Sequence, residues 1–102
     1  MNWQVIRDGH LVVKLDGHLD LWSVPEIRKG ILKVARRKSI HTLGIDLTDV
    51  KSLDTAGLAL LVEIHRLLRR RGGRFYLVGF DNHIEKMIRL AGLDGLLRKL
   101  DS

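Results

Sequence analysis

One stretch of the chain constrains the fold more than any other, and it runs from Asp46 to Leu61 with the sequence DLTDVKSLDTAGLALL. It begins as the end of an apolar strand and continues through a short polar connection. Small residues then lead into an apolar helix. This order places Asp54 and Thr55 in the first turn of that helix. The sequence therefore predicts that the functional surface lies at the start of this helix.

The size and composition of the chain indicate one folded domain, spanning residues 1–102. Its 102 residues, 45% of them hydrophobic, are enough for one core that buries ~65% of the surface of the unfolded chain. The absence of cysteine excludes disulfides and cysteine-ligated metals. No apolar run reaches the roughly 20 residues that span a bilayer. We therefore expect a soluble, cytoplasmic protein that does not insert into a membrane.

The net charge of +6 and the pI of about 10.2 raise the question of an anionic partner. The cations cluster at 36–38 and 69–71, where two predicted helices end, and cations are favourable at helix C-termini. No aromatic residues interleave with them, as a groove for single-stranded nucleic acid would require. The pattern favours solvated helix ends, and we expect no nucleic-acid partner.

The hydrophobic pattern predicts alternating strands and helices. The expected strands are 3–6, 11–15, 42–47 and 75–78, and the expected helices start at about 24, at 56 and at about 82, followed by a helical turn or two within 93–100. An Asp8-Gly9 turn joins the first two strands. The order ββαβαβα with short connections predicts an α/β domain, a mixed sheet covered by helices.

Local signals refine these boundaries. Residues 16–20 are expected to break the second strand. Ser23 with Glu26, and again Asn82 with Glu85, have the spacing of a capping box, in which a side-chain oxygen accepts from a first-turn amide. Each pair therefore predicts a helix start.

The last third of the chain is more apolar. The strand 75–78 is nearly all apolar, which predicts burial on both faces among parallel neighbours. The inward stripe of the last helix is expected to comprise Ile84, Met87, Ile88 and Ala91.

The helix 56–70 has two faces. The expected core face comprises Leu60, Leu61, Ile64, Leu67 and Leu68, and the opposite side comprises Thr55, Leu58, Val62, His65 and Arg69. Leu58 and Val62 are out of place on a solvated side. Either a neighbouring helix covers them, or they form an apolar contact patch for a partner.

Thr55 also has a purely structural interpretation. Thr and Asp are common helix caps, and a capping Thr needs no further purpose. Its residue type and position alone favour that interpretation.

The segments Leu53–Leu58 (LDTAGL), 17–20 (GHLD), 72–73 (GG) and 91–93 (AGL) together resemble the STAS family, named for sulfate transporters and anti-sigma factor antagonists. The resemblance covers essentially the whole chain, and the Asp-(Ser/Thr)-x-Gly signature is fairly specific in that context. It implies a compact domain without enzymatic activity, often an adaptor whose hydroxyl residue after the motif Asp can be phosphorylated.

In the anti-sigma factor antagonists of this family, the unphosphorylated form binds a serine kinase and frees a sigma factor. The resemblance implies Thr55 as phosphoacceptor beside Asp54, Gly57 as the small motif residue, and Asp20 near the same surface. The full set of expected partner contacts is Asp20, Asp54, Thr55, Ala56, Gly57, Leu58, Val62, His65 and Arg69. A phosphate would add about −1.5 to −2 charges to this surface, partly compensated by the helix N-terminus and its amides.

Two features depart from the antagonist pattern. Ala56 stands where many antagonists have a second hydroxyl residue, and Thr55 replaces the more usual Ser. The sequence DTAGLALL resembles that of the small STAS subunit of Mla-type phospholipid-trafficking ABC transporters. That resemblance implies a cytoplasmic adaptor, held at the inner face of the membrane by an ABC transporter ATPase subunit, with Thr55 as an unmodified contact. Both roles stay open, and we favour the serine kinase or anti-sigma factor as partner.

Other function classes find little support. The histidines at 10, 18, 41, 65 and 83 show no metal-ligand spacing, and no nucleophile–base pair is apparent. The glycines at 72 and 73 are more simply explained as a helix stop than as a phosphate loop. Nucleotide binding near Asp20 and Asp54 is disfavoured because carboxylates repel phosphates. We expect no enzyme activity, no cofactor and no metal.

Overall fold

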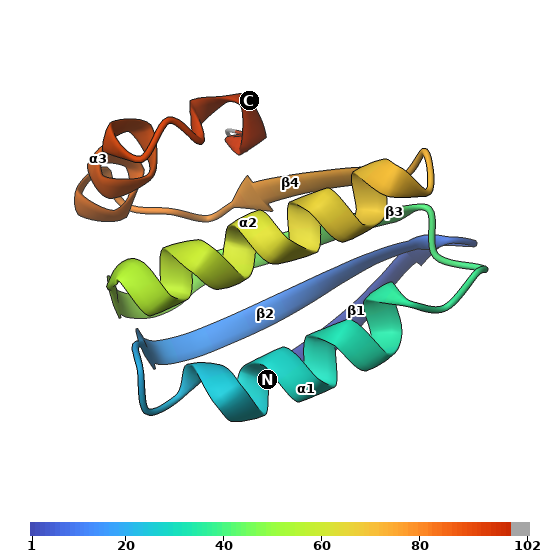
Figure 1. Ribbon diagram of the computed structural model, residues 1–102, viewed down its shortest axis with the longest axis horizontal. Coiled ribbons are helices and arrows are strands. Elements are labelled where there is room, and N and C mark those ends of the chain that lie inside the picture. The colour runs from blue at the N-terminus through green and yellow to red at the C-terminus, as the bar shows by residue number, and fades with distance from the viewer. Residues whose placement is uncertain (99–102) are drawn as a thin grey trace.

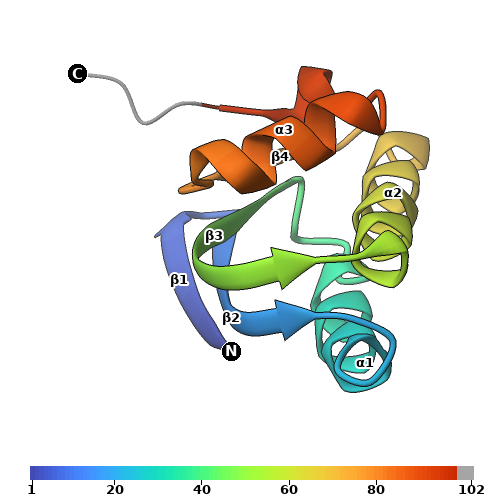
Figure 2. The same ribbon diagram turned by 90° about the vertical axis from the view of Figure 1, so that its left-hand side faces the viewer.

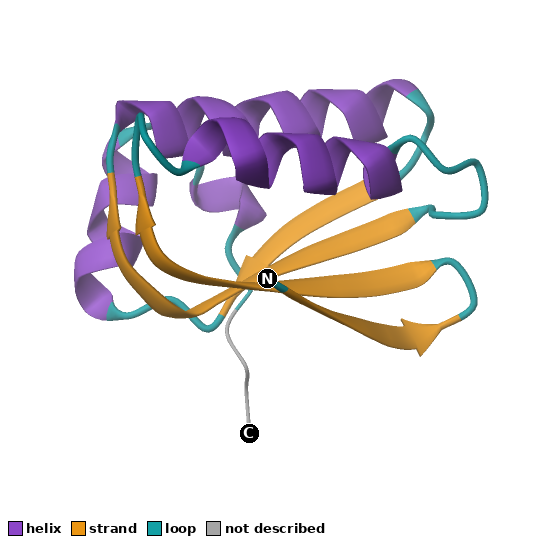
Figure 3. Ribbon diagram, turned by 90° about the horizontal axis from the view of Figure 1, so that it is seen from below, coloured by secondary structure: helices purple, strands orange, loops and turns teal. Residues whose placement is uncertain are grey.

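A computed structural model describes residues 1–98, which form a four-stranded sheet with helices packed on one of its faces (Figures 1 and 3). The elements are β1 (Asn2–Arg7), β2 (His10–Leu19), α1 (Val24–Ala35), β3 (Thr42–Leu53), α2 (Thr55–Arg70), β4 (Arg74–Val78), α3 (Asn82–Leu90) and the 3₁₀ turn η1 (Asp94–Leu96). The predicted order ββαβαβα is confirmed.

The sheet is mixed, with the strand order β1-β2-β3-β4. β1 pairs antiparallel with β2, as the Asp8-Gly9 turn predicts, and Trp3 lies opposite Val13. β2–β3 and β3–β4 are parallel, with Ile45 opposite both Val13 and Leu77. Parallel strands require crossover connections, which α1 and α2 supply. The two helices consequently lie over the same face (Figure 3).

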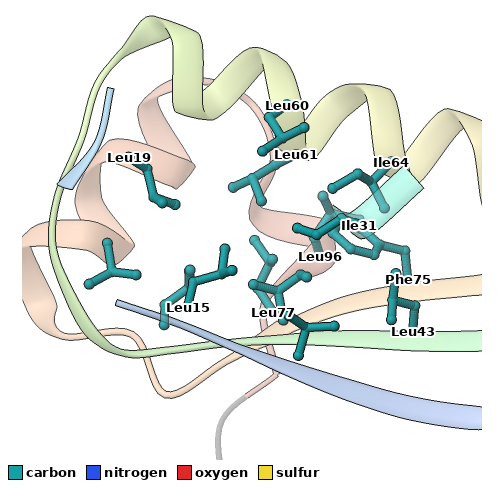
Figure 4. Packing of buried hydrophobic residues seen from close by; sticks show 14 of the residues in the cluster. Leu15, Leu19, Ile31, Leu43, Leu60, Leu61, Ile64, Phe75, Leu77 and Leu96 are labelled. Atoms are coloured by element: carbon teal, nitrogen blue, oxygen red, sulfur yellow. The ribbon is translucent and has the colours of Figure 1, made fainter. Parts of the chain in front are cut away.

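The core fills the space between the sheet and the helices (Figure 4). Alternate residues of the strands point into it, and the helices contribute one stripe each. Among its members are Val13, Leu15, Leu43, Ile45, Leu47, Ile31, Leu60, Leu61, Ile64, Leu68, Phe75 and Leu77. The predicted core face of α2 is buried at Leu60, Leu61, Ile64 and Leu68, while Leu67 is partly buried.

β2 and β3 continue past their predicted ends, so the expected strand break at 16–20 is wrong. β2 bends instead, with register shifts against β3 between Lys14 and Asp16 and between Gly17 and His18. Such bulges increase twist and curvature without ending the ladder. Gly17 takes a φ of +73°, which glycine adopts at no steric cost. Figures 2 and 3 show both strands curling toward the start of α2.

The two predicted capping boxes are also wrong in detail. Ser23 has helical backbone angles and makes no capping bond; its hydroxyl donates to the His18 carbonyl at 2.5 Å instead. α3 is capped by Asp81 rather than Asn82, since Asp81 Oδ1 accepts from the Ile84 amide at 2.8 Å. The Ser23 hydroxyl is thus engaged by a backbone carbonyl, and the first-turn amide of α3 by the residue before Asn82. These hydrogen bonds, and not the capping-box spacing, determine how the two helices start.

Two predictions for the last third of the chain need correction. β4 is the edge strand beyond β3, and Tyr76 is only partly buried because no helix covers its face. Ala91 is exposed, since α3 ends at Leu90. In the tail, the predicted helical turn is confirmed as η1, where Leu96 is buried, and Leu97 forms a bridge with Leu77. The predicted helical turns extend to residue 100, which lies outside the described residues.

Candidate functional site

Asp54 forms the start of α2. Its backbone is extended, and its Oδ1 accepts from the amides of Ala56 at 2.8 Å and Gly57 at 3.1 Å. Its own amide donates to the Leu19 carbonyl at 3.1 Å. Asp54 is therefore both the N-cap of α2 and the link between that helix and the end of β2.

Thr55 is the first helical residue and is exposed to solvent. Asp54 performs the capping, so the interpretation of Thr55 as a cap is ruled out by the geometry. Within residues 1–98, the Thr55 hydroxyl makes no hydrogen bond. A free, exposed hydroxyl at a helix start is available to a modifying enzyme or a partner.

Gly57 is buried against the end of β2. A methyl group at this position would lie 2.7 Å from the Leu19 carbonyl oxygen and 2.5 Å from Cδ1 of Leu53. Backbone can therefore approach backbone here only because the side chain is absent. The small motif residue sets how closely α2 lies against the two strands that carry the site.

Asp20 organises the loop between β2 and α1. Its Oδ1 accepts from the amides of Trp22 at 2.9 Å and Ser23 at 3.0 Å. The Ser23 amide first, and the Trp22 amide after it, stabilise the carboxylate and lower the pKa of Asp20 below its usual value. Because Leu19 bonds to Asp54, this loop lies at the same end of the molecule as Thr55 (Figure 1).

The same loop presents two apolar side chains that the sequence reasoning missed. Leu21 is 69% exposed and Trp22 is 87% exposed. Large apolar side chains this exposed are typical of contact surfaces, and Trp is enriched among residues that dominate binding energy. A Leu-Trp pair in a short turn, outside any periodic pattern, was the signal in the sequence.

The remaining predicted contacts do not form one patch. Ala56 is half-buried in the first turn of α2. Leu58 is partly buried against the core, and the His65 ring stacks on Phe75 at a centroid distance of 6.2 Å. Val62 stays half-exposed, and Arg69 is exposed. Packing against the core thus accounts for Leu58 and His65, while Val62 faces the space between α1 and α2 and Thr55 stays exposed.

The electrostatics of the site are acidic. Neither Asp20 nor Asp54 forms an ion pair with a residue in 1–98. Across the same residues, no group of three or more His, Cys, Asp or Glu side chains is placed to hold a metal ion. None of the helices described is long and apolar enough to span a bilayer. The site therefore combines unpaired carboxylates, a free hydroxyl and exposed apolar side chains.

Comparison with known proteins identifies relatives of this arrangement. The STAS domain model matches residues 4–102. The anti-sigma-B factor antagonist of Staphylococcus epidermidis is 28% identical over 93 residues, covering 91% of this chain and 85% of that protein.

Solved structures share the fold as well. The unphosphorylated anti-sigma factor antagonist SpoIIAA superimposes with a TM-score of 0.86 at 21% identity, covering 99% of this chain and 88% of that chain. A putative antagonist from Thermotoga maritima gives 0.87 at 20% identity, covering 99% and 86%. The family resemblance read from the Asp54–Gly57 motif is thus matched along nearly the whole chain, and the protein belongs to the STAS domain family.

Proposed function

We propose that this protein is an adaptor of a partner-switching pathway, an anti-sigma factor antagonist whose binding is controlled by phosphorylation of Thr55. The observation that carries the proposal is the division of roles at the start of α2. Asp54 satisfies the first-turn amides, so the exposed Thr55 hydroxyl has no structural role. The relatives named anti-sigma-B factor antagonists support the choice of pathway.

The partner in this proposal is a serine kinase that is also the anti-sigma factor. It transfers the γ-phosphoryl group of ATP to the Thr55 oxygen, and ADP and the hydroxyl proton leave. The unmodified adaptor binds this kinase and releases its sigma factor, whereas the phosphorylated adaptor does not bind. The protein itself acts through contact and not through catalysis.

The local electrostatics explain why a phosphate would act as a switch. It brings about −1.5 to −2 charges next to Asp54 and Asp20, neither of which is neutralised by an ion pair within residues 1–98. The amides of Ala56 and Gly57 already bond to Asp54, so the phosphate would compete for them. The added charge therefore stays largely uncompensated, and a partner surface that accepts a neutral Thr55 repels it.

The apolar loop supplies the attractive part of the same interface. Leu21 and Trp22 are exposed beside the acidic groups. Burial of such side chains provides affinity that does not depend on charge. Phosphorylation then needs only to offset this contact, since a like charge placed in an interface costs several kcal/mol.

Capture from the native cell extract tests the proposal. Wild-type protein, Thr55→Ala, Thr55→Glu and Ser39→Glu serve as baits, with bound proteins read by mass spectrometry. Ser39 is exposed between α1 and β3, away from the α2 start, so Ser39→Glu is the matched charge control. We expect the wild type, Thr55→Ala and Ser39→Glu to capture a kinase-like anti-sigma factor, and Thr55→Glu to lose it.

The second step adds ATP to the captured complex and reads the mass of the adaptor. A phosphoryl group on Thr55 is expected, and none on the Thr55→Ala protein. Retention of the kinase by Thr55→Glu would contradict the switch. Recovery of an ABC transporter ATPase by all four baits would instead assign the protein to the Mla-type transporter role.

A further inference from the structure

A groove between α1 and α2 lies outside the Asp54–Gly57 site and shares only Val62 with the predicted partner contacts. We call it the α1–α2 groove. It is a cavity of about 510 Å³ lined by Leu32, Arg36, Ala59, Val62, Glu63, Arg66, Leu67 and Arg70. Leu32 is buried, Val62 and Leu67 are half-buried, and the arginines are exposed. The groove therefore has an apolar floor and a cationic rim.

The three arginines of the rim lack close ion pairs within residues 1–98. Arg36, Arg66 and Arg70 form no ion pair there. Glu63 is the only carboxylate among the residues that line the groove, and both of its oxygens accept from Arg28, at 2.8 and 2.6 Å. The pKa of Glu63 is lowered first by its hydrogen bond to Arg28, and the charges of Arg28 and Arg36 contribute less. The rim thus keeps its positive charge available to an external anion.

Stabilisation of helix ends does not explain the arrangement fully. Arg36 follows α1 and Arg70 is in the last turn of α2, where cations meet the negative ends of the helix dipoles. Arg66 lies before that turn and four residues from Arg70, and like charges at this spacing destabilise a helix. The carbonyls of Arg37 and Ile40, beyond the end of α1, already accept hydrogen bonds from the Arg71 guanidinium, at 3.1 and 2.8 Å.

The groove is long and open. Its α2 residues follow helical spacing from Ala59 to Arg70, a length of about 16 Å, or three helical turns. Small-molecule sites usually enclose most of their ligand, which a groove with an exposed rim does not. An apolar groove between two helices is a common binding site for an amphipathic helix.

We propose that the α1–α2 groove binds an acidic amphipathic helix of a protein partner. Carboxylates of that helix pair with Arg36, Arg66 and Arg70, while its apolar side chains rest on Leu32 and Leu67. The identity of the partner rests on the proposed function, because Ala59 lies one turn from Thr55. One partner then contacts the Thr55 site and the groove together.

The test is a titration of ¹⁵N-labelled full-length protein with a synthetic peptide. The probe is an acidic amphipathic peptide of about 14 residues, with glutamates and leucines at helical spacing so that they occupy adjoining faces. A peptide of identical composition in scrambled order is its control. We expect the intact probe to shift amide signals at the α1–α2 groove, and the scrambled peptide to bind at least about tenfold more weakly.

Variants separate the groove from general charge attraction. Arg66→Gln and Arg70→Gln should each raise the dissociation constant about tenfold, since each removes a charged hydrogen-bond donor. Arg74→Gln is the matched control, because Arg74 is exposed at the start of β4 outside the groove. An equal loss with Arg74→Gln, or no shifts at about 1 mM probe, would overturn the proposal.

Two further titrations test other anions as ligands of the groove. An oligothymidylate and vesicles containing phosphatidylglycerol are titrated under the same salt conditions. Stronger binding of either one at the groove would overturn the assignment of an acidic helix as its ligand. Thr55→Glu is expected to bind the probe like the wild type. Failure of the probe therefore refutes the groove proposal alone, while failure of the Thr55 switch is read only in the capture experiment.

Discussion

Two adjacent residues have different roles at the start of α2. The Asp54 side chain holds the amides of Ala56 and Gly57, and Thr55 presents its hydroxyl to solvent. Capping and the proposed phosphorylation therefore fall on different side chains. A substitution at Thr55 can change binding without unfolding the helix, which is what a regulatory position requires.

This division predicts different effects on stability. Asp54→Ala removes the cap and should lower the free energy of unfolding by about 1 kcal/mol. Thr55→Ala should change it by less than about 0.5 kcal/mol, as is usual for exposed positions without partners. Urea unfolding of both variants measures the difference. Equal losses would show that Thr55 shares the capping.

Gly57 provides a second prediction at the residue scale. Gly57→Ala adds a methyl group against the Leu19 carbonyl, and the resulting strain should cost about 1 to 3 kcal/mol despite the better helix propensity of alanine. Gly30→Ala in α1 is the control, because its methyl would meet only the flexible end of Met1. Thermal unfolding should show Gly30→Ala within about 1 kcal/mol of the wild type. A tolerated Gly57→Ala would contradict the close approach.

At the scale of elements, the face of the sheet opposite the helices carries a polar contact between β2 and β4. The Tyr76 ring lies over Gly44 of the intervening β3, where any side chain would collide with it. The Tyr76 hydroxyl reaches His10 Nε2 at 2.6 Å. Burial, followed by the charges of Arg7 and His41, lowers the pKa of His10. Burial also raises the pKa of Tyr76.

The lowered pKa of His10 predicts a loss of stability in acid. As the pH falls below about 6.5, the ordinary pKa of histidine, the unfolded chain takes up the proton before the folded protein does. The free energy of unfolding therefore falls with pH until it levels off below the pKa of the folded state. Urea unfolding between pH 8 and pH 5, as approximate limits for the histidine range, should show a shallower decline for His10→Gln than for the wild type. Identical slopes would show that His10 is not the group responsible.

At the scale of the whole molecule, the two ends of the parallel helices differ in chemistry. The starts of α1 and α2 lie at the same end as the ends of β2 and β3 (Figure 1). Asp20 and the exposed Trp22 belong to the loop before α1, and Asp54 caps α2. The other ends carry the arginines of the α1–α2 groove, Arg36, Arg66 and Arg70. A partner that covers this side of the molecule would meet an acidic end, with the proposed phosphorylation site, and a cationic end in one fixed orientation.

Trp22 should therefore matter for binding and not for folding. Trp22→Ala should weaken capture of the partner at least about tenfold, because exposed Trp residues are frequent binding anchors. Its melting temperature should stay near that of the wild type, since the side chain is 87% exposed. Calorimetry and binding assays on the same preparation check both. Unchanged affinity would remove the apolar loop from the interface.

The sequence by itself determined the order of elements and the start of α2. Hydrophobic periodicity marks each strand and helix locally, and a carboxylate before a run of small and apolar residues identifies Asp54 and Thr55 as the helix start. These signals need no information about distant parts of the chain, so they can be read from short windows.

Only the tertiary structure decided what depends on contacts between distant segments. The bulges in β2 are stabilised by pairing with β3, and they turn the predicted break at 16–20 into a bend. The bond from Asp54 to Leu19 brings the loop that carries Trp22 to the same end of the molecule as Thr55. Packing of α1 against α2 creates the groove from residues far apart in sequence. Each feature depends on the free energy of a contact between residues far apart in the sequence. The periodicity within a short window contains no information about such a contact.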